Sequence, residues 1–147
     1  MELHFVVNPI AKNGYAYYIW SKIKIYLTEQ NIPFQYYITK NQGDAERYVA
    51  DMLQRTKKKI FLVAVGGDGT VHEVVNGSHS FENAIIGCIP AGSGNDFSRG
   101  LLLPKSPKKA LQLILNKMKK NLPIKHIDLG KYGTNIQKLV FVNNLGC

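Results

Sequence analysis

Apolar segments alternate with amphipathic ones along most of the chain, and their lengths separate strands from helices. The short apolar runs that predict buried strands are Leu3–Val7, Phe34–Thr39, Ile60–Val65 and Ala84–Ile89. The segments with helical spacing are Tyr15–Gln30, Gly43–Thr56, Val71–Gly77 and Pro107–Lys120. Strands that alternate with helices predict an α/β fold, an open and mostly parallel sheet with helices on both faces, of Rossmann-like type.

Each predicted helix has its own set of apolar residues. In the first helix, Ile19, Ile23, Ile25 and Leu27 supply much of the apolar character. In the second helix, Ala45, Tyr48, Val49 and Leu53 are spaced for burial. The last helix has an apolar stripe formed by Leu111, Ile114, Leu115 and Met118, with lysines mostly opposite. We expect this stripe to pack on the sheet and the lysines to face solvent; the alternative is a helix that lies on anionic lipid.

The segment Val65-Gly66-Gly67-Asp68-Gly69-Thr70-Val71 joins a predicted strand to a predicted helix. Glycines let an anion approach the backbone closely, and the first N–H groups of a helix need acceptors, so such a junction can hold phosphate. Thr70 is expected to cap the helix. Asp68 would repel phosphates unless a metal ion or a transferable proton lies between them, which suggests phosphoryl transfer from a nucleotide. The alternative is a tight turn in which the aspartate accepts local hydrogen bonds.

Two further polar loops follow apolar strands. They are Asn8–Gly14 near the start and Ala91-Gly92-Ser93-Gly94-Asn95-Asp96-Phe97-Ser98-Arg99-Gly100 after the fourth strand. In an open α/β sheet, ligands bind beyond the carboxyl ends of the strands, so the three loops are expected to converge on one crevice. The chain has neither a GxxxxGK[ST] loop nor a GxGxxG at its first turn, which excludes an ordinary P-loop and a dinucleotide fingerprint.

These motifs, in this order and spacing, resemble the diacylglycerol kinase catalytic-domain family, which includes bacterial lipid kinases and sphingosine kinases. Three more segments fit the resemblance: Thr39 with Gly43-Asp44-Ala45, Ile127-Asp128-Leu129-Gly130, and Phe141-Val142-Asn143-Asn144-Leu145-Gly146. The resemblance implies ATP-dependent phosphorylation of a lipid hydroxyl, with a diacylglycerol-like acceptor. The chain departs from the family pattern at Lys12, where many relatives carry glycine.

The resemblance also implies roles for particular residues. The expected nucleotide-binding residues are Asn8, Lys12, Thr39, Gly66, Gly67, Asp68, Gly69, Thr70, Val71, His72, Ser93 and Asn95. The expected catalytic carboxylates are Asp68, Asp96 and Asp128, and Asp68 with Asp96 would hold Mg²⁺. Asp68 is the first choice of base, as in sphingosine-kinase-like members; in other relatives the base lies in a second domain, and Asp68 then supports the metal. Asp96 as a helix cap and Asp128 as a plain strand end are the structural alternatives.

Family members continue into a β-rich second domain. Residues 1–122 are therefore expected to form the α/β nucleotide-binding domain. Residues 123–147 read as two strands, Pro123–Lys131 and Lys138–Asn143, that lead into a second domain absent from this chain. Two rival hypotheses stay open. One is an NAD kinase-like enzyme, which shares the Gly-Gly-Asp-Gly-Thr motif; the other is a catalytically incomplete module that only binds ATP.

Composition limits the class of protein. The chain has 147 residues, 45% of them hydrophobic, enough for one core. Its two cysteines give no disulfide framework, its histidines have no paired ligand spacing, and neither a leader nor a membrane-spanning run is evident. The net charge of +9 favours an anionic partner such as ATP or membrane lipid. Aromatic residues do not interleave with the lysines, so nucleic acid is not expected. We expect a cytoplasmic protein in peripheral contact with the inner face of the membrane; whether it forms a homo-oligomer stays open.

Overall fold

The computed structural model describes residues 1–91, 106–120, 124–127 and 139–142. In these residues six strands form one sheet in the order β2-β1-β3-β4-β6-β5. The strands are β1 (Glu2–Val7), β2 (Gln35–Ile38), β3 (Ile60–Gly66), β4 (Ala84–Pro90), β5 (Ile124–Ile127) and β6 (Leu139–Val142). Every neighbouring pair is parallel except β5 with β6, which is antiparallel.

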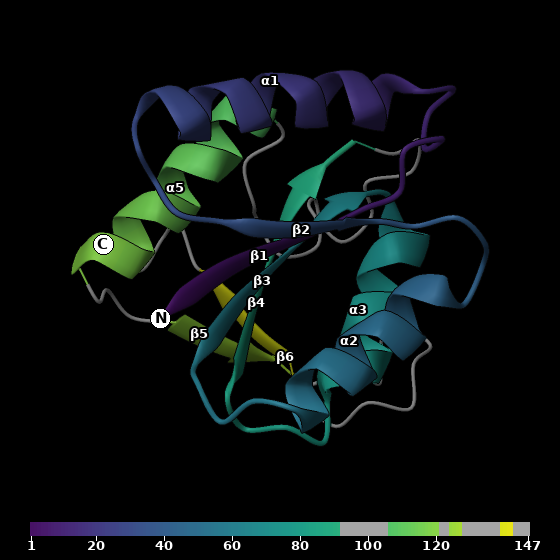
Figure 1. The fold of residues 1–147 in the computed structure, drawn as a ribbon, viewed down its shortest axis with the longest axis vertical. Helices are drawn as coiled ribbons and strands as arrows, with labels where there is room; N and C mark the ends of the chain where they lie inside the picture. Colours follow the sequence, from purple (N-terminus) through teal and green to yellow (C-terminus); the bar gives the residue numbers. More distant parts are fainter. Residues whose placement is uncertain (92–105, 121–123, 128–138, 143–147) are drawn as a thin grey trace.

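Helices cover both faces of this sheet (Figure 1). Helices α1 (Tyr15–Glu29) and α5 (Pro107–Lys120) lie on one face. Helices α2 (Asp44–Gln54) and α3 (Asp68–Ser78) lie on the other. The open, mostly parallel α/β architecture predicted from the alternation of patterns is thus confirmed. The described helices include none that is both long and apolar enough to cross a bilayer.

The core has two layers, because successive side chains of a strand point to opposite faces of a sheet. In β1, Leu3, Phe5 and Val7 pack toward α1 and α5, whereas Val6 packs toward α2 and α3. The central strand β3 is buried along its whole length, as expected of a parallel strand covered on both faces. The apolar stripe of α5 also packs on the sheet, as expected.

Three of the four residues that give α1 much of its apolar character, Ile19, Ile23 and Leu27, are buried, whereas Ile25 is 59% exposed. Ile25 follows Ile23 by two residues, which is more than half a turn around a helix, so the two side chains cannot share a face. The third helix begins at Asp68, three residues before its expected start, because the chain turns at Gly67 directly after β3. Thr70 therefore lies inside the first turn and does not cap the helix.

Helices α2 and α3 approach each other closely at Gly77. A Cβ atom at this position would lie 2.5 Å from the Glu46 carbonyl oxygen and 3.0 Å from the Val49 Cβ. Real Cβ atoms do not approach other atoms so closely, so only glycine fits this crossing. The contact fixes the spacing of the two helices whose first turns border the cavity described below.

Strands β5 and β6 lie within the two ranges expected for the end of the chain and pair with each other. Residues 128–138, which join them, lie outside the described residues. The division of the chain at residue 122 stays a prediction.

Candidate functional site

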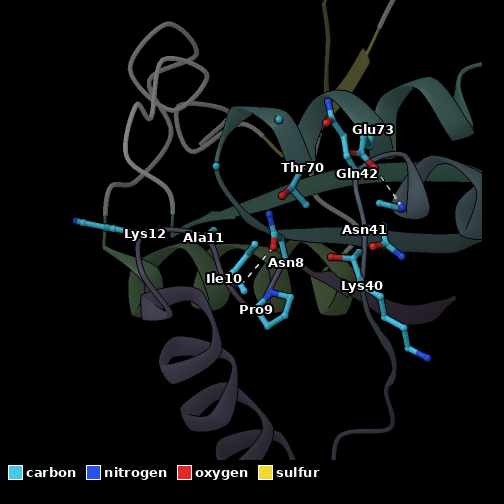
Figure 2. Close-up of a pocket in the computed structure, with 14 residues that line it drawn as sticks. Asn8, Pro9, Ile10, Ala11, Lys12, Lys40, Asn41, Gln42, Thr70 and Glu73 are labelled. Carbon is cyan, nitrogen blue, oxygen red and sulfur yellow. Dashed lines mark hydrogen bonds between the residues drawn. The ribbon is translucent and has the colours of Figure 1, made fainter.

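A cavity of about 430 Å³ lies at the carboxyl ends of β1, β2 and β3. Three loops enclose it, one from each strand, since the order β2-β1-β3 places these strand ends side by side. Its lining residues are Asn8, Pro9, Ile10, Ala11, Lys12, Thr39, Lys40, Asn41, Gln42, Ala45, Gly67, Gly69, Thr70 and Glu73. They are drawn in Figure 2. In parallel α/β sheets this edge is where ligands bind.

The first loop is fixed by Asn8. Its backbone N–H donates to the Val65 carbonyl at 3.0 Å, which continues the pairing of β1 with β3. Its side-chain oxygen accepts a hydrogen bond from the Ile10 N–H at 3.3 Å, and its carbonyl accepts one from the Ala11 N–H at 3.3 Å. Such a turn uses the oxygen end of the amide and leaves its nitrogen end directed toward Thr70 (Figure 2).

Three consecutive residues of this loop have left-handed backbone conformations. The φ angles are 51° at Lys12, 56° at Asn13 and 91° at Gly14. A non-glycine residue such as lysine is strained in this region. The Lys12 ammonium lies 5.1 Å from the centroid of the Tyr15 ring, and its side chain extends away from the cavity (Figure 2). Lys12 thus lines the cavity mainly through the base of its side chain and places its charge at the rim.

Asp44 holds the second loop, which follows β2. One oxygen, Oδ2, accepts hydrogen bonds from the Tyr37 hydroxyl and from the Lys40 backbone N–H, both at 2.8 Å. The hydrogen bond from Lys40, followed by the one from Tyr37, lowers the pKa of Asp44 below its usual value. The bond to Asp44 also raises the pKa of Tyr37. Because Asp44 is the first residue of α2, it ties the loop of Lys40, Asn41 and Gln42 to that helix.

A stacked pair of tyrosines continues from this loop into the sheet. The rings of Tyr37 and Tyr48 are 4.0 Å apart and nearly parallel, at 8°. The Tyr48 hydroxyl lies 2.6 Å from Nε2 of His4 in β1. The other ring nitrogen of His4, Nδ1, is buried and has no hydrogen-bond partner. Burial lowers the pKa of His4, so the imidazole is held in its neutral form.

The third loop joins β3 to α3. A Cβ atom on Gly66 would lie 2.6 Å from Oγ1 of Thr70, so this position has room only for glycine. A Cβ atom on Gly69 would meet nothing within 4 Å, so the cavity side of that residue is open. The residue before the helix, Gly67, offers no side-chain cap. The first turn of α3, whose N–H groups need acceptors, therefore borders the open cavity.

Glu73 reaches across the cavity wall to the neighbouring helix. Its Oε1 atom accepts a hydrogen bond from the Ala45 backbone N–H at 3.2 Å (Figure 2). The residue before α2, Gly43, has a φ of 85° and no side chain, so Glu73 supplies the acceptor that a capping residue would give. Glu73 of α3 therefore stabilises the start of α2.

The structure brings together half of the expected nucleotide-binding residues. Those that line the cavity are Asn8, Lys12, Thr39, Gly67, Gly69 and Thr70. Four others lie next to it without lining it: Gly66, Asp68, Val71 and His72. The buried side chain of Val71 belongs to the core between the sheet and α2 and α3. Ser93, Asn95, Asp96 and Asp128 lie outside the described residues. The roles of all these residues stay predictions.

The residues that sequence reasoning missed come mainly from the loop after β2. Lys40, Asn41 and Gln42 line the cavity next to Thr39, whose N–H donates to the Val7 carbonyl at 2.9 Å. Ligands bind at the carboxyl ends of parallel strands, and this rule applies to β2 as well. The rule could therefore have identified these three residues from the sequence. The residues that the structure describes contain no group of three or more His, Cys, Asp or Glu side chains that could hold a metal ion.

The chain is similar to known proteins in sequence and fold. A family model described as the diacylglycerol kinase catalytic domain matches residues 2–127. The chain belongs to this family.

Over 107 residues it is 34% identical to a Xanthomonas campestris protein named "Probable lipid kinase YegS-like", a match that covers 69% of this chain and 34% of that protein. Over 77 residues it is 39% identical to a diacylglycerol kinase of Bacillus subtilis, covering 51% of this chain and 25% of that one. A crystal structure of a diacylglycerol kinase from Bacillus anthracis matches with a TM-score of 0.66 and 31% identity, over 86% of this chain and 44% of that one.

The chain thus spans about a third of the length of the curated relatives it matches, 33% and 34% for two of them. The names of these relatives support a kinase of the lipid kinase class.

Proposed function

We propose that this chain is the nucleotide-binding part of an ATP-dependent lipid kinase. The enzyme would transfer the γ-phosphate of ATP to the hydroxyl of a diacylglycerol-like lipid. The observation that carries the proposal is the single cavity of about 430 Å³ where three loops meet, one of them a glycine-rich start of a helix. The names of the family and of its relatives support the lipid as acceptor.

In this proposal the phosphates of ATP lie against the third loop. The open side of Gly69 lets the phosphates approach the first N–H groups of α3, and the Thr70 hydroxyl lies beside them. Asn8 and Thr39 would contact the nucleotide from the neighbouring loops. Lys12 and Lys40, whose side chains extend from the two ends of the cavity, would attract the anionic nucleotide through their field (Figure 2).

Asp68 is the proposed base within this chain. It lies between Gly67 and Gly69, two residues that line the cavity. Its carboxylate would accept the proton of the lipid hydroxyl while the hydroxyl oxygen attacks the γ-phosphorus and ADP leaves. If the base lies in a second domain, Asp68 would support it from this side.

Mg²⁺ is the metal that the family reaction implies. Mg²⁺ is commonly held by one or two carboxylates together with the substrate phosphates, which fits Asp68 with Asp96 as a proposed pair. When bound it would neutralise charge on the phosphate oxygens.

A lipid acceptor also places the reaction at a membrane. We propose peripheral contact with the inner face of the membrane and no binding of nucleic acid. An NAD kinase-like activity is the rival enzyme, and a module that binds ATP without transferring its phosphate is the rival without catalysis.

The test is the transfer of labelled γ-phosphate from Mg-ATP to diacylglycerol in mixed micelles, with NAD as a parallel acceptor. Asp68→Asn should abolish transfer. Asp51→Asn should leave it unchanged, because this matched carboxylate lies on the outer side of α2 and pairs with Arg55 at 3.2 Å. Transfer of phosphate to NAD instead of lipid would contradict the proposal and favour an NAD kinase-like activity. ATP binding without transfer to either would support the incomplete module.

A further inference from the structure

Charge is divided unevenly between the two helical layers. Helix α5 contains five lysines and no acidic residue, and α1 contains two lysines and one acidic residue, Glu29, at its end. On the opposite face, α2 and α3 together contain five acidic residues and a single basic one, Arg47. Among the helices that the structure describes, positive charge is therefore concentrated on the layer of α1 and α5.

Large apolar and aromatic side chains are exposed on the same layer. Tyr18 is 55% exposed, Ile25 is 59% exposed and Tyr26 is 41% exposed, although they belong to a helix whose inner face is well buried. Spacings of three and four residues place these side chains with Lys22 on one flank of α1. The Lys22 ammonium lies 5.0 Å from the centroid of the Tyr18 ring. Tyrosine and lysine together are typical of surfaces that contact the polar boundary of a bilayer.

A groove of about 330 Å³ separates this flank from the start of α5. Its floor is apolar, formed in part by Ile19, Ile23 and Leu111. Lys22 borders the groove from α1, and Lys108 borders it from α5. Lys119 follows Lys108 by three turns and is also exposed. An apolar floor between cationic edges is complementary to lipid, which presents acyl chains beneath anionic headgroups.

We infer that the surface formed by Tyr18, Lys22, Ile25, Tyr26, Lys108 and Lys119, here called the α1–α5 surface, docks on an anionic phospholipid bilayer. The lysines contact phosphate groups of the lipids, and the exposed side chains of α1 enter the boundary between headgroups and acyl chains. The acidic layer of α2 and α3 faces away from the membrane, because the same surface potential repels it. The inference deepens the proposed lipid kinase function, on which its biological meaning rests.

This orientation brings the cavity close to the lipid. Helix α1 begins at Tyr15, immediately after the loop whose residues line the cavity. In that loop Ile10, which also lines the cavity, is 77% exposed. A membrane on the α1–α5 surface therefore lies beside the site where the proposed phosphate donor binds.

The experiment is co-sedimentation of the chain with vesicles of phosphatidylcholine, with and without phosphatidylglycerol. The test variant is Lys22→Gln with Lys108→Gln. The matched control is Lys57→Gln with Lys59→Gln, which removes the same charge from exposed positions just before β3, outside the surface. A third variant, Ile25→Ser, removes an exposed apolar side chain without opening the core.

The chain should bind vesicles that contain phosphatidylglycerol and should bind pure phosphatidylcholine much more weakly. The test pair should lower the binding constant by about 10- to 30-fold, because each lysine near an anionic surface contributes about fivefold. The control pair should lower it by less than about threefold, through screened long-range attraction only. Ile25→Ser should weaken binding several-fold.

Equal losses for the two lysine pairs would overturn the inference, since binding would then follow net charge alone. Failure of the unmodified chain to bind anionic vesicles, or equally tight binding to duplex DNA at the same salt, would also overturn it. None of these readouts needs phosphate transfer, so failure of this inference is distinguishable from failure of the proposed function, which is tested by phosphate transfer in mixed micelles.

Discussion

Replacement of Gly77 by alanine tests the packing that positions the cavity. In most helices this substitution stabilises, by about 1 kcal/mol, because alanine has the higher helix propensity. Here the added Cβ would lie 2.5 Å from the Glu46 carbonyl oxygen and 3.0 Å from the Val49 Cβ, so α2 and α3 must move apart. Both neighbours belong to the main chain or lie next to it, and they cannot rotate away as the end of a long side chain would.

The expected change in the free energy of unfolding is the cost of overpacking minus the gain in helix propensity. Overpacking of a tight contact costs about 1–3 kcal/mol, and we take the upper part of this range because the contact is with backbone. After subtraction of the propensity gain, the free energy of unfolding should fall by about 1–2 kcal/mol. For a chain of this size that lowers Tm by roughly 3–6 °C.

Gly69→Ala is the matched control, because it lies in the same helix and its Cβ would meet nothing within 4 Å. Its free energy of unfolding should stay the same or rise by up to about 1 kcal/mol. Thermal and urea denaturation of the two variants beside the unmodified chain give both values. A Tm for Gly77→Ala equal to or above that of the unmodified chain would refute the close contact of α2 and α3.

Three further predictions concern the loops and the sheet. Asp44→Ala should lower the free energy of unfolding by about 2 kcal/mol in urea denaturation at neutral pH, because the Tyr37 hydroxyl and the Lys40 N–H lose a charged acceptor. A loss of stability no larger than that of Asp51→Ala would contradict this prediction. Stability should fall as the pH drops below about 6.5, because the unfolded chain then binds a proton at His4 that burial excludes in the fold. This part of the pH dependence of Tm should disappear in His4→Gln and persist in His79→Gln, an exposed control. Lys12→Gly should raise Tm by the equivalent of about 0.5–1 kcal/mol, because φ is 51° at this residue. The rise should be larger than for Asn31→Gly, where φ is 57° but asparagine tolerates the conformation better. An unchanged or lower Tm for Lys12→Gly would argue against backbone strain at this position.

The elements of the fold could be predicted because the strands are apolar and the helices amphipathic. Because β3 is buried along its whole length, its sequence is an uninterrupted run of apolar residues, which does not fit the pattern of an amphipathic helix. The predicted cap at Thr70 was wrong because it was inferred from residue type alone. Thr70 is a good capping residue, but it comes three residues after Gly67, where the turn occurs.

The site could be predicted only in part, because part of it depends on the order of strands. Residues in recognisable motifs, such as Asn8 and Gly69, were identified from sequence and lie at the cavity. Asn41 and Gln42 belong to no such motif, and they border the cavity because β1 lies between β2 and β3 in the sheet. The hydrogen bond from Ala45 to Glu73 joins residues 28 apart, which no local pattern reveals. The loop that follows β4 lies outside the described residues, so its expected place in the crevice stays a prediction.

The central claim is that ATP binds in the cavity at the ends of β1, β2 and β3. Titration of the isotope-labelled chain with Mg-ATP, followed by the chemical shifts of backbone amides, tests it most directly. The largest changes should occur at Gly67, Gly69 and Thr39, and Gly69→Val, which fills the open side of the loop, should weaken binding at least tenfold. Absence of binding, or changes centred on the α1–α5 surface with Gly67 and Gly69 unaffected, would contradict the claim.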